Sequence, residues 1–161
     1  MLDRCFIIQR FFLKSGKVLV MINTHNSAFD DGTLRKAELN ILKETAITEF
    51  RKGNYVIVGG DWNLNPPGFK LSMIKTGDIA ASNDVNNSSG SLMPDGWQWA
   101  FDNKTPSNRF VNEPYKKGQT KTTIIDYFLL SPNVRLIKVE TINLGFQHSD
   151  HNPVKMNVQL L

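Results

Sequence analysis

Two runs of apolar side chains lie near the start of the chain, and their pattern predicts a β-hairpin. Residues 5–13 and 18–23 are rich in branched and aromatic side chains, which favour strands. Between the two runs stand Ser15-Gly16-Lys17, a sequence suited to a tight turn. This first part of the chain is therefore expected to form two antiparallel strands.

Residues 33–52 repeat apolar side chains at spacings of three and four, which predicts a helix with one apolar face. Thr33 is a suitable N-cap, and Gly53 supplies the C-terminal stop. The continuously apolar run 55–58 that follows is typical of a strand buried on both faces.

The second half of the chain predicts further strands, at 96–101, 124–130, 134–143 and 154–160. The polar segment 83–91 and most of 102–121 are expected to be loops. A strand, a helix, a strand and then many strands predict an α/β (α+β) fold with a mixed sheet and helices on one side. We expect a single domain over residues 1–161.

Composition narrows the class of protein only slightly. An apolar content of 40% supports a folded core, and the lone Cys5 excludes an intrachain disulfide and a cysteine-based metal site. No run reaches the roughly 18 apolar residues that a membrane-spanning helix needs. The net charge of +4 suits a polyanionic substrate without identifying one.

Four polar clusters stand at the ends of apolar runs, and they carry the candidate chemistry. They are Asn23-Thr24-His25, Gly59-Gly60-Asp61-Trp62-Asn63, Ile125-Asp126-Tyr127 and Ser149-Asp150-His151-Asn152-Pro153-Val154. Carboxylates are hard ligands for divalent cations, and imidazoles transfer protons. This combination is what a metal-assisted phosphoester hydrolase requires.

Asp61 and Asn63 stand two residues apart on an extended segment, so both are expected to face the same side. That arrangement suits the orientation of a water or a phosphate oxygen. The alternative is an Asx turn that closes the strand. The preceding Gly59-Gly60 are expected to let the backbone turn tightly and approach the substrate.

Asp150 beside His151 combines a hard metal ligand with a general base or imidazolium. The alternative is a capped turn with a surface histidine. Asp126 interrupts an apolar run, so its carboxylate needs a partner, and we assign His151. Backbone amides are the alternative partners.

His25 ends a predicted strand, where a structural role competes with a catalytic one. Arg4 opens the first strand and is a candidate phosphate contact, with an ordinary surface arginine as the alternative. His148 is expected to be a loop residue outside the site.

In this order, the four clusters resemble the endonuclease/exonuclease/phosphatase (DNase I-like) superfamily, over residues 4–158. The resemblance implies a sandwich with a mixed, mainly antiparallel sheet and flanking helices. It also implies in-line attack of water on a phosphoester. Asp150 would bind Mg²⁺ or Mn²⁺, and His151 would be the catalytic imidazole, oriented by Asp126. Contacts to the water or the phosphate would come from Asp61, Asn63, His25 and Arg4.

The resemblance further implies that the chain corresponds to the C-terminal half to two-thirds of the family's domain. The family's chief acidic metal ligand precedes the part that aligns with Arg4. One sheet face would lack its packing partner, so we expect an exposed apolar patch. Such a chain is expected to associate with a second copy or with another chain, or to be marginally stable.

The substrate class stays open at this stage. A nuclease is favoured by basic residues before Asp126, namely Lys104, Arg109, Lys116, Lys117 and Lys121. The alternatives are a lipid or sugar-phosphate phosphatase or phosphodiesterase, and an inactive fragment that acts as a binding module. Trp97 and Trp99 are expected in the core.

Overall fold

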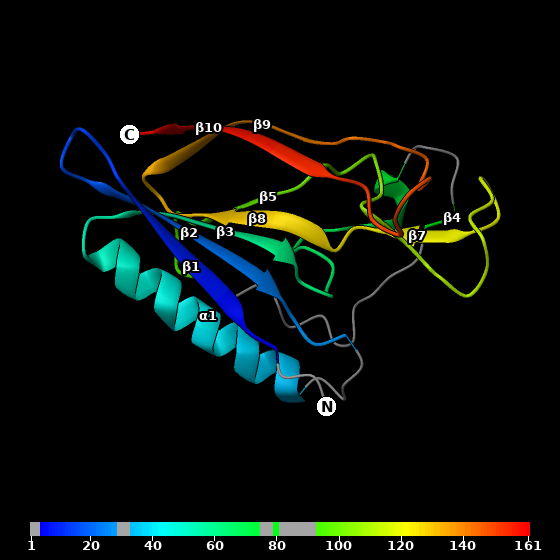
Figure 1. Ribbon diagram of the computed structural model, residues 1–161, viewed down its shortest axis with the longest axis horizontal. Helices are drawn as coiled ribbons and strands as arrows, with labels where there is room; N and C mark the ends of the chain where they lie inside the picture. Colours follow the sequence, from blue (N-terminus) through cyan, green and yellow to red (C-terminus); the bar gives the residue numbers. More distant parts are fainter. Residues whose placement is uncertain (1–3, 29–32, 75–78, 81–92) are drawn as a thin grey trace.

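The computed structural model describes residues 4–28, 33–74, 79–80 and 93–161, which are arranged in layers around a central sheet. This sheet has five strands, in the order β1 (Phe6–Phe12), β2 (Val18–His25), β3 (Tyr55–Asp61), β8 (Asp126–Leu130) and β5 (Gln98–Ala100). Helix α1 (Thr33–Arg51) lies on one side of it (Figure 1). On the other side lies a two-stranded sheet of β9 (Val134–Thr141) and β10 (Val154–Leu160) (Figure 1).

The central sheet is mixed and mainly antiparallel, as predicted. β1 pairs antiparallel with β2 through the predicted hairpin, and β8 pairs antiparallel with both β3 and β5. Only β2 and β3 are parallel, because α1 connects them as a crossover. Their C-terminal ends therefore meet at one edge of the sheet.

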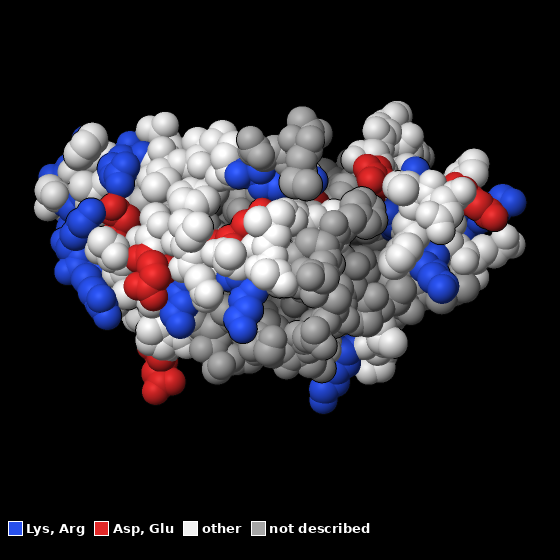
Figure 2. Space-filling model, turned by 90° about the horizontal axis from the view of Figure 1, so that it is seen from below, with Lys and Arg blue, Asp and Glu red and all other residues white. Residues whose placement is uncertain are grey.

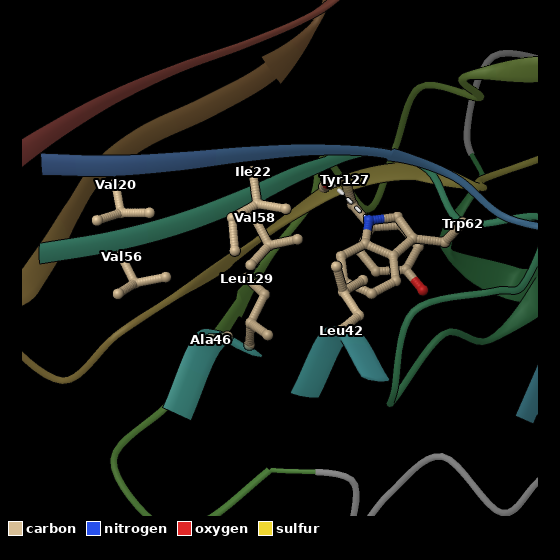
Figure 3. Packing of buried hydrophobic residues seen from close by; sticks show 9 residues of the cluster. All are labelled: Val20, Ile22, Leu42, Ala46, Val56, Val58, Trp62, Tyr127 and Leu129. Carbon is tan, nitrogen blue, oxygen red and sulfur yellow. Dashed lines mark hydrogen bonds between the residues drawn. The ribbon is translucent and has the colours of Figure 1, made fainter. Parts of the chain in front are cut away.

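Alternate residues of the strands face α1 and build one core. Leu42 and Ala46 of the helix pack with a buried cluster from the sheet, made of Val20, Ile22, Val56, Val58, Trp62, Tyr127 and Leu129 (Figure 3). Trp62 stacks on Tyr127 with ring centroids 5.1 Å apart, and its Nε1 donates to the Tyr127 carbonyl at 2.9 Å. This anchor fixes the chain just after β3, where the polar cluster Asp61–Asn63 stands. Trp97 and Trp99 pack against the same cluster, as expected.

The opposite face of the central sheet is only partly covered. Tyr55, Ile57 and Leu130 are buried against the β9–β10 layer. Towards β1, however, Ile7 and Phe11 remain 66% and 45% exposed. A groove of about 660 Å³ runs between this exposed face and the segment that leads into β10. The apolar patch expected from the sequence is therefore present.

A small third sheet adds short strands that the sequence did not predict. It consists of β4 (Ile79–Ala80), β7 (Lys121–Thr123) and β6 (Asn108–Arg109), so part of the expected loop 102–121 is extended and paired. Sequence periodicity missed β6 because it is two residues long and polar. The short 3₁₀ helix η1 (Leu71–Met73) follows the Pro66-Pro67-Gly68 turn. The predicted loop 83–91 lies outside the described residues.

Several strand boundaries also differ from the predictions; β3, for example, ends at Asp61 rather than at residue 58. β8 begins at Asp126 rather than at residue 124, and β9 ends at Thr141 rather than at residue 143. Among the described residues, α1 is the single α-helix, and no helix there is long and apolar enough to cross a membrane. On the face that carries α1, basic and acidic side chains are interspersed (Figure 2).

Candidate active site

Sheet register places three of the predicted site residues side by side. His25, the last residue of β2, is the partner of Asp61, the last residue of β3. Asp61 is in turn the partner of Asp126, the first residue of β8. Directly opposite residues of neighbouring strands project to the same face. The three side chains therefore form a row at one edge of the sheet, on the face away from α1.

His151 joins this row from the loop before β10. Its Nδ1 lies 2.8 Å from Oδ2 of Asp126, so the structure contains the pair that the sequence suggested. Its Nε2 lies 3.9 Å from Oδ2 of Asp61. Both the histidine and Asp126 are half-buried, with side chains 30% and 19% exposed. The ring is therefore oriented by one carboxylate and directed towards another.

The segment that holds His151 in place was not recognised in the sequence. Buried Ser107 accepts hydrogen bonds from the amides of Ile125 and Asp126, both at 3.0 Å. The Ser107 carbonyl accepts from the amide of Asn152 at 2.7 Å. The next residue, Asn108, forms a bridge with His151. Residues 107–108 thus tie the two predicted clusters together, and nothing in their composition marks them as more than a turn.

The electrostatics of the site follow from this crowding. The hydrogen bond with Asp126 raises the pKa of His151 above its ordinary value, and burial opposes this effect. Burial raises the pKa of Asp61, and the nearby charge of Asp126 adds to the rise. The hydrogen bond from the Asn63 amide and the two histidines act in the opposite direction. Two carboxylates on adjacent strands therefore repel each other, and a cation would relieve that repulsion.

Asp61 and Asn63 form the Asx turn that was the alternative prediction for this pair. The backbone amide of Asn63 donates to Oδ1 of Asp61 at 2.9 Å, as in an Asx turn. Its φ of 50° is in the left-handed region, which asparagine tolerates better than most residues. Its side chain is buried and donates to the Asn26 carbonyl at 2.8 Å. Contact between Asn63 and a phosphate stays a prediction.

The two glycines before Asp61 have a different role from the one expected. β3 continues straight through them to Asp61, so they do not form a turn. A Cβ on Gly59 would lie 2.5 Å from the ring of Phe128, and one on Gly60 would lie 2.0 Å from the Thr24 carbonyl oxygen. The glycines are required because neighbouring strands and side chains approach the backbone closely.

His25 and Arg4 lie at the solvent-exposed side of the row. The His25 side chain is 55% exposed, and its Nε2 is 3.4 Å from Oδ2 of Asp61. Nη1 of Arg4 lies 3.1 Å from both ring nitrogens of His25. The two residues are therefore close to each other and to Asp61, at a place that a ligand can reach. His148 is exposed in the loop before β10, as predicted.

A candidate metal group is formed by Asp61, Asp126 and His151, whose ligand atoms lie within 4.8 Å of one another. Asp150, the predicted ligand, does not belong to this group within the described part of the chain. It is half-buried next to His151, and its carbonyl accepts from the amide of Arg109 at 2.9 Å. The two carboxylates supply the hard oxygen ligands that Mg²⁺ or Mn²⁺ prefers, whereas an imidazole is a more usual ligand for Zn²⁺ and other transition metals.

Arg35 is a further residue that sequence reasoning missed. It is 2% exposed, and its guanidinium donates to the carbonyls of Asn63 at 3.0 Å and Ala28 at 3.1 Å. It thereby connects α1 to the loops that follow β2 and β3. An arginine in the first turn of a helix normally suggests a surface position, so the sequence held no signal for this role.

Solved structures share this arrangement of strands, although no family model and no curated protein matches the sequence. An endonuclease/exonuclease/phosphatase from Bacteroides vulgatus superposes with a TM-score of 0.63 at 20% identity, over 98% of this chain and 56% of that one. TDP2 from Danio rerio, complexed with a single-strand DNA product, gives 0.63 at 17% identity, over 97% and 62%. A mannosyl-6-phosphatase from Bacteroides thetaiotaomicron gives 0.61 at 18% identity, over 99% and 58%.

These likenesses establish the fold. The chain has the fold of the endonuclease/exonuclease/phosphatase proteins, as the resemblance of its motifs implied. It spans a little over half the length of the solved structures it matches, with coverages of 56%, 58% and 62%.

Proposed function

We propose that this chain carries the catalytic residues of a divalent-metal-dependent phosphoesterase. The observation that carries the proposal is the row of His25, Asp61 and Asp126, completed by His151 at 2.8 Å from Asp126. A carboxylate–imidazole pair beside a second carboxylate is an arrangement that can activate water.

The chain's own residues suggest how a water is prepared for in-line attack on phosphorus. Oδ2 of Asp61 and Nε2 of His151 are 3.9 Å apart, less than twice a hydrogen bond of about 2.8 Å, so one water can bond to both. Asp61 orients this water, and Nε2 of His151 takes its proton. Asp126 holds the Nδ1 proton and stabilises the imidazolium that forms.

The proposed metal is Mg²⁺ or Mn²⁺. Asp61 and Asp126 would hold it, and Asp150 is the further ligand that the sequence predicts. Burial, together with the nearby charge of Asp126, raises the pKa of Asp61, and a cation at this position would offset both effects. When bound, such a cation would offset the negative charge that develops on the phosphoryl oxygens. Arg4 and His25, at the exposed side of the row, would contact the phosphate or its leaving group.

A nuclease is the favoured substrate class, and a sugar-phosphate or lipid phosphoesterase is the second candidate. Exposed Lys104, Lys116, Lys117 and Lys121 supply positive charge on the segment before β8, which supports a nucleic-acid backbone as substrate. Arg109, the fifth residue of the expected rim, instead donates to the carbonyls of Phe110 and Glu113. The solved relatives include both a DNA-bound protein and a mannosyl-6-phosphatase.

Hydrolysis assays test the proposal directly. Plasmid DNA, bis(p-nitrophenyl) phosphate and mannose 6-phosphate are incubated with the protein and Mg²⁺ or Mn²⁺, against EDTA. We expect metal-dependent turnover that is lost in His151→Ala and retained in His148→Ala, the matched control from the same loop. No turnover by a folded wild-type protein would refute the enzymatic proposal and favour a binding module.

We also propose that a second copy of this chain covers the exposed face next to β1. In the described part of the chain, β1 is an edge strand of the central sheet, and the backbone groups on its outer side adjoin the exposed Ile7 and Phe11. Antiparallel pairing of two β1 strands about a twofold axis would extend the sheet and join the two apolar faces.

Light scattering during size-exclusion chromatography tests this association. We expect a concentration-dependent dimer that dissociates in Phe11→Lys and persists in Val111→Lys, a matched change at a distant exposed residue. A monomer at every concentration would exclude the dimer.

A further inference from the structure

We propose that Asn108 is a further catalytic residue. In the substrate-free site its side-chain amide donates a hydrogen bond to Nε2 of His151. In the substrate complex the same amide donates to a phosphoryl oxygen of the substrate. This inference rests on the proposed phosphoesterase function. Neither the sequence motifs nor the predicted roles include Asn108.

Two contacts define the position of the Asn108 amide. Nδ2 lies 3.0 Å from Nε2 of His151 and donates to the Asp150 carbonyl at 3.3 Å. The second contact directs the NH₂ group, rather than the carbonyl oxygen, towards the ring. The Asn108 backbone is held by pairing with Thr123 and by the bridge to His151. The amide is therefore fixed beside the reactive nitrogen.

These contacts determine the tautomer of the neutral ring. A side-chain NH₂ group only donates, so Nε2 of His151 must accept from Asn108. The ring proton then resides on Nδ1, where it donates to Oδ2 of Asp126 at 2.8 Å. Asp126 and Asn108 thus hold the ring from opposite sides, in the tautomer that a general base requires.

The same contact blocks the base. Nε2 has one lone pair, and in this arrangement the lone pair accepts from Asn108 instead of from a water beside Asp61. Substrate binding must therefore separate Nδ2 from Nε2. A half-buried amide that loses its acceptor needs another, because an unsatisfied donor is unfavourable.

A phosphoryl oxygen is the acceptor that the reaction itself brings. The attacked phosphorus must lie within reach of the water between Asp61 and His151, and Asn108 is 3.0 Å from that histidine. A rotation of the side chain is enough to transfer the hydrogen bond. A bond to a charged oxygen is also stronger than one to a neutral ring nitrogen, so the exchange favours substrate binding.

The competing explanation is that Asn108 only clamps the loop of Asp150 and His151. Three variants separate the two explanations. Asn108→Ala removes the amide, and Asn108→Asp keeps its shape but replaces the donor with a negative charge. Asn157→Ala, an exposed asparagine on β10, is the matched control.

The experiment combines nitrogen-15 NMR of the His151 ring with binding of inorganic phosphate, measured by NMR titration in Mg²⁺. Spectra are recorded at alkaline pH, where the ring is neutral. We expect the Nε2 signal to shift in both Asn108 variants, phosphate affinity to fall about tenfold in Asn108→Ala and further in Asn108→Asp, and no change in the control. Where bis(p-nitrophenyl) phosphate is hydrolysed, KM should rise in Asn108→Ala.

The outcomes distinguish this inference from the proposed function. Unchanged phosphate affinity in folded Asn108→Ala, or an unshifted Nε2 signal, would overturn the role of Asn108 while leaving the phosphoesterase proposal intact. A wild-type protein that neither binds phosphate nor hydrolyses an ester would overturn both.

Discussion

Replacement of Asp126 by asparagine tests the central contact of the site. The carboxylate accepts from Nδ1 of His151 at 2.8 Å, and its charge also raises the pKa of Asp61. Asparagine has the same shape and leaves the two hydrogen bonds from the amides of residues 125 and 126 to Ser107 in place. The substitution therefore removes one charge with little disturbance of the backbone.

The magnitude follows from the strength and burial of this bond. A hydrogen bond to a charged group contributes about 1.5–3 kcal/mol. The side chains of His151 and Asp126 are 30% and 19% exposed, so the upper end of that range does not apply. We expect Asp126→Asn to lower the free energy of unfolding by about 1–2 kcal/mol at pH 6.

The destabilisation caused by Asp126→Asn should decrease as the pH rises. A histidine whose pKa is raised by folding stabilises the protein fully below its unfolded pKa of about 6.5. This stabilisation disappears as the pH rises through the folded pKa. At pH 9, removal of Asp126 also relieves its repulsion of Asp61. The difference between wild type and Asp126→Asn should therefore be clearly smaller at pH 9 than at pH 6.

Urea unfolding at both pH values measures this difference, and NMR titration follows His151 and Asp61 individually. We expect both pKa values to be lower in Asp126→Asn than in the wild type. Asp95→Asn, at an exposed position, is the control and should change neither quantity. Equal destabilisation at pH 6 and pH 9, with an unaltered pKa of His151, would refute the reasoning.

Three further predictions concern the supports of the site. Gly60→Ala should lower the free energy of unfolding by about 3 kcal/mol or more, because φ is +143° and the new Cβ would overlap the Thr24 carbonyl. Urea unfolding measures this effect, with Gly16→Ala as the control because no atom lies within 4 Å of a Cβ there. An effect of Gly60→Ala no larger than that of the control would contradict the prediction. Arg35→Met should cost about 2–4 kcal/mol in thermal unfolding, since it leaves two carbonyls without a donor, and a wild-type melting temperature would argue against it. Mg²⁺ at ten times its Kd should stabilise the wild type by about 1.4 kcal/mol, and an equal gain in Asp61→Asn would exclude this carboxylate as a ligand.

Local sequence signals predicted the elements that depend on neighbouring residues. The hairpin, the helix and the strand that leads to Asp61 all follow from periodicity and turn residues, and the structure contains each within three residues of its predicted end. The pairing of Asp126 with His151 was also accessible, because a carboxylate in an apolar run needs a partner.

Residues 107–108 and Arg35 could not be recognised in the same way. Ser107 and Asn108 are small polar residues in a segment without periodicity, and their partners stand 15 to 45 positions away in the sequence. Arg35 is buried only because the loops after β2 and β3 both approach the first turn of α1. Long-range hydrogen bonds of this kind leave no trace in local composition.

The sequence by itself determined which chemical groups are available and on which strand ends they stand. Hydrophobic periodicity is a local property, so it specifies elements and their polar termini. Only the tertiary structure decided that His25, Asp61 and Asp126 share one row, because register depends on how β2, β3 and β8 pair. Tertiary packing also decided that Gly60 approaches Thr24, since steric exclusion acts between residues distant in the chain.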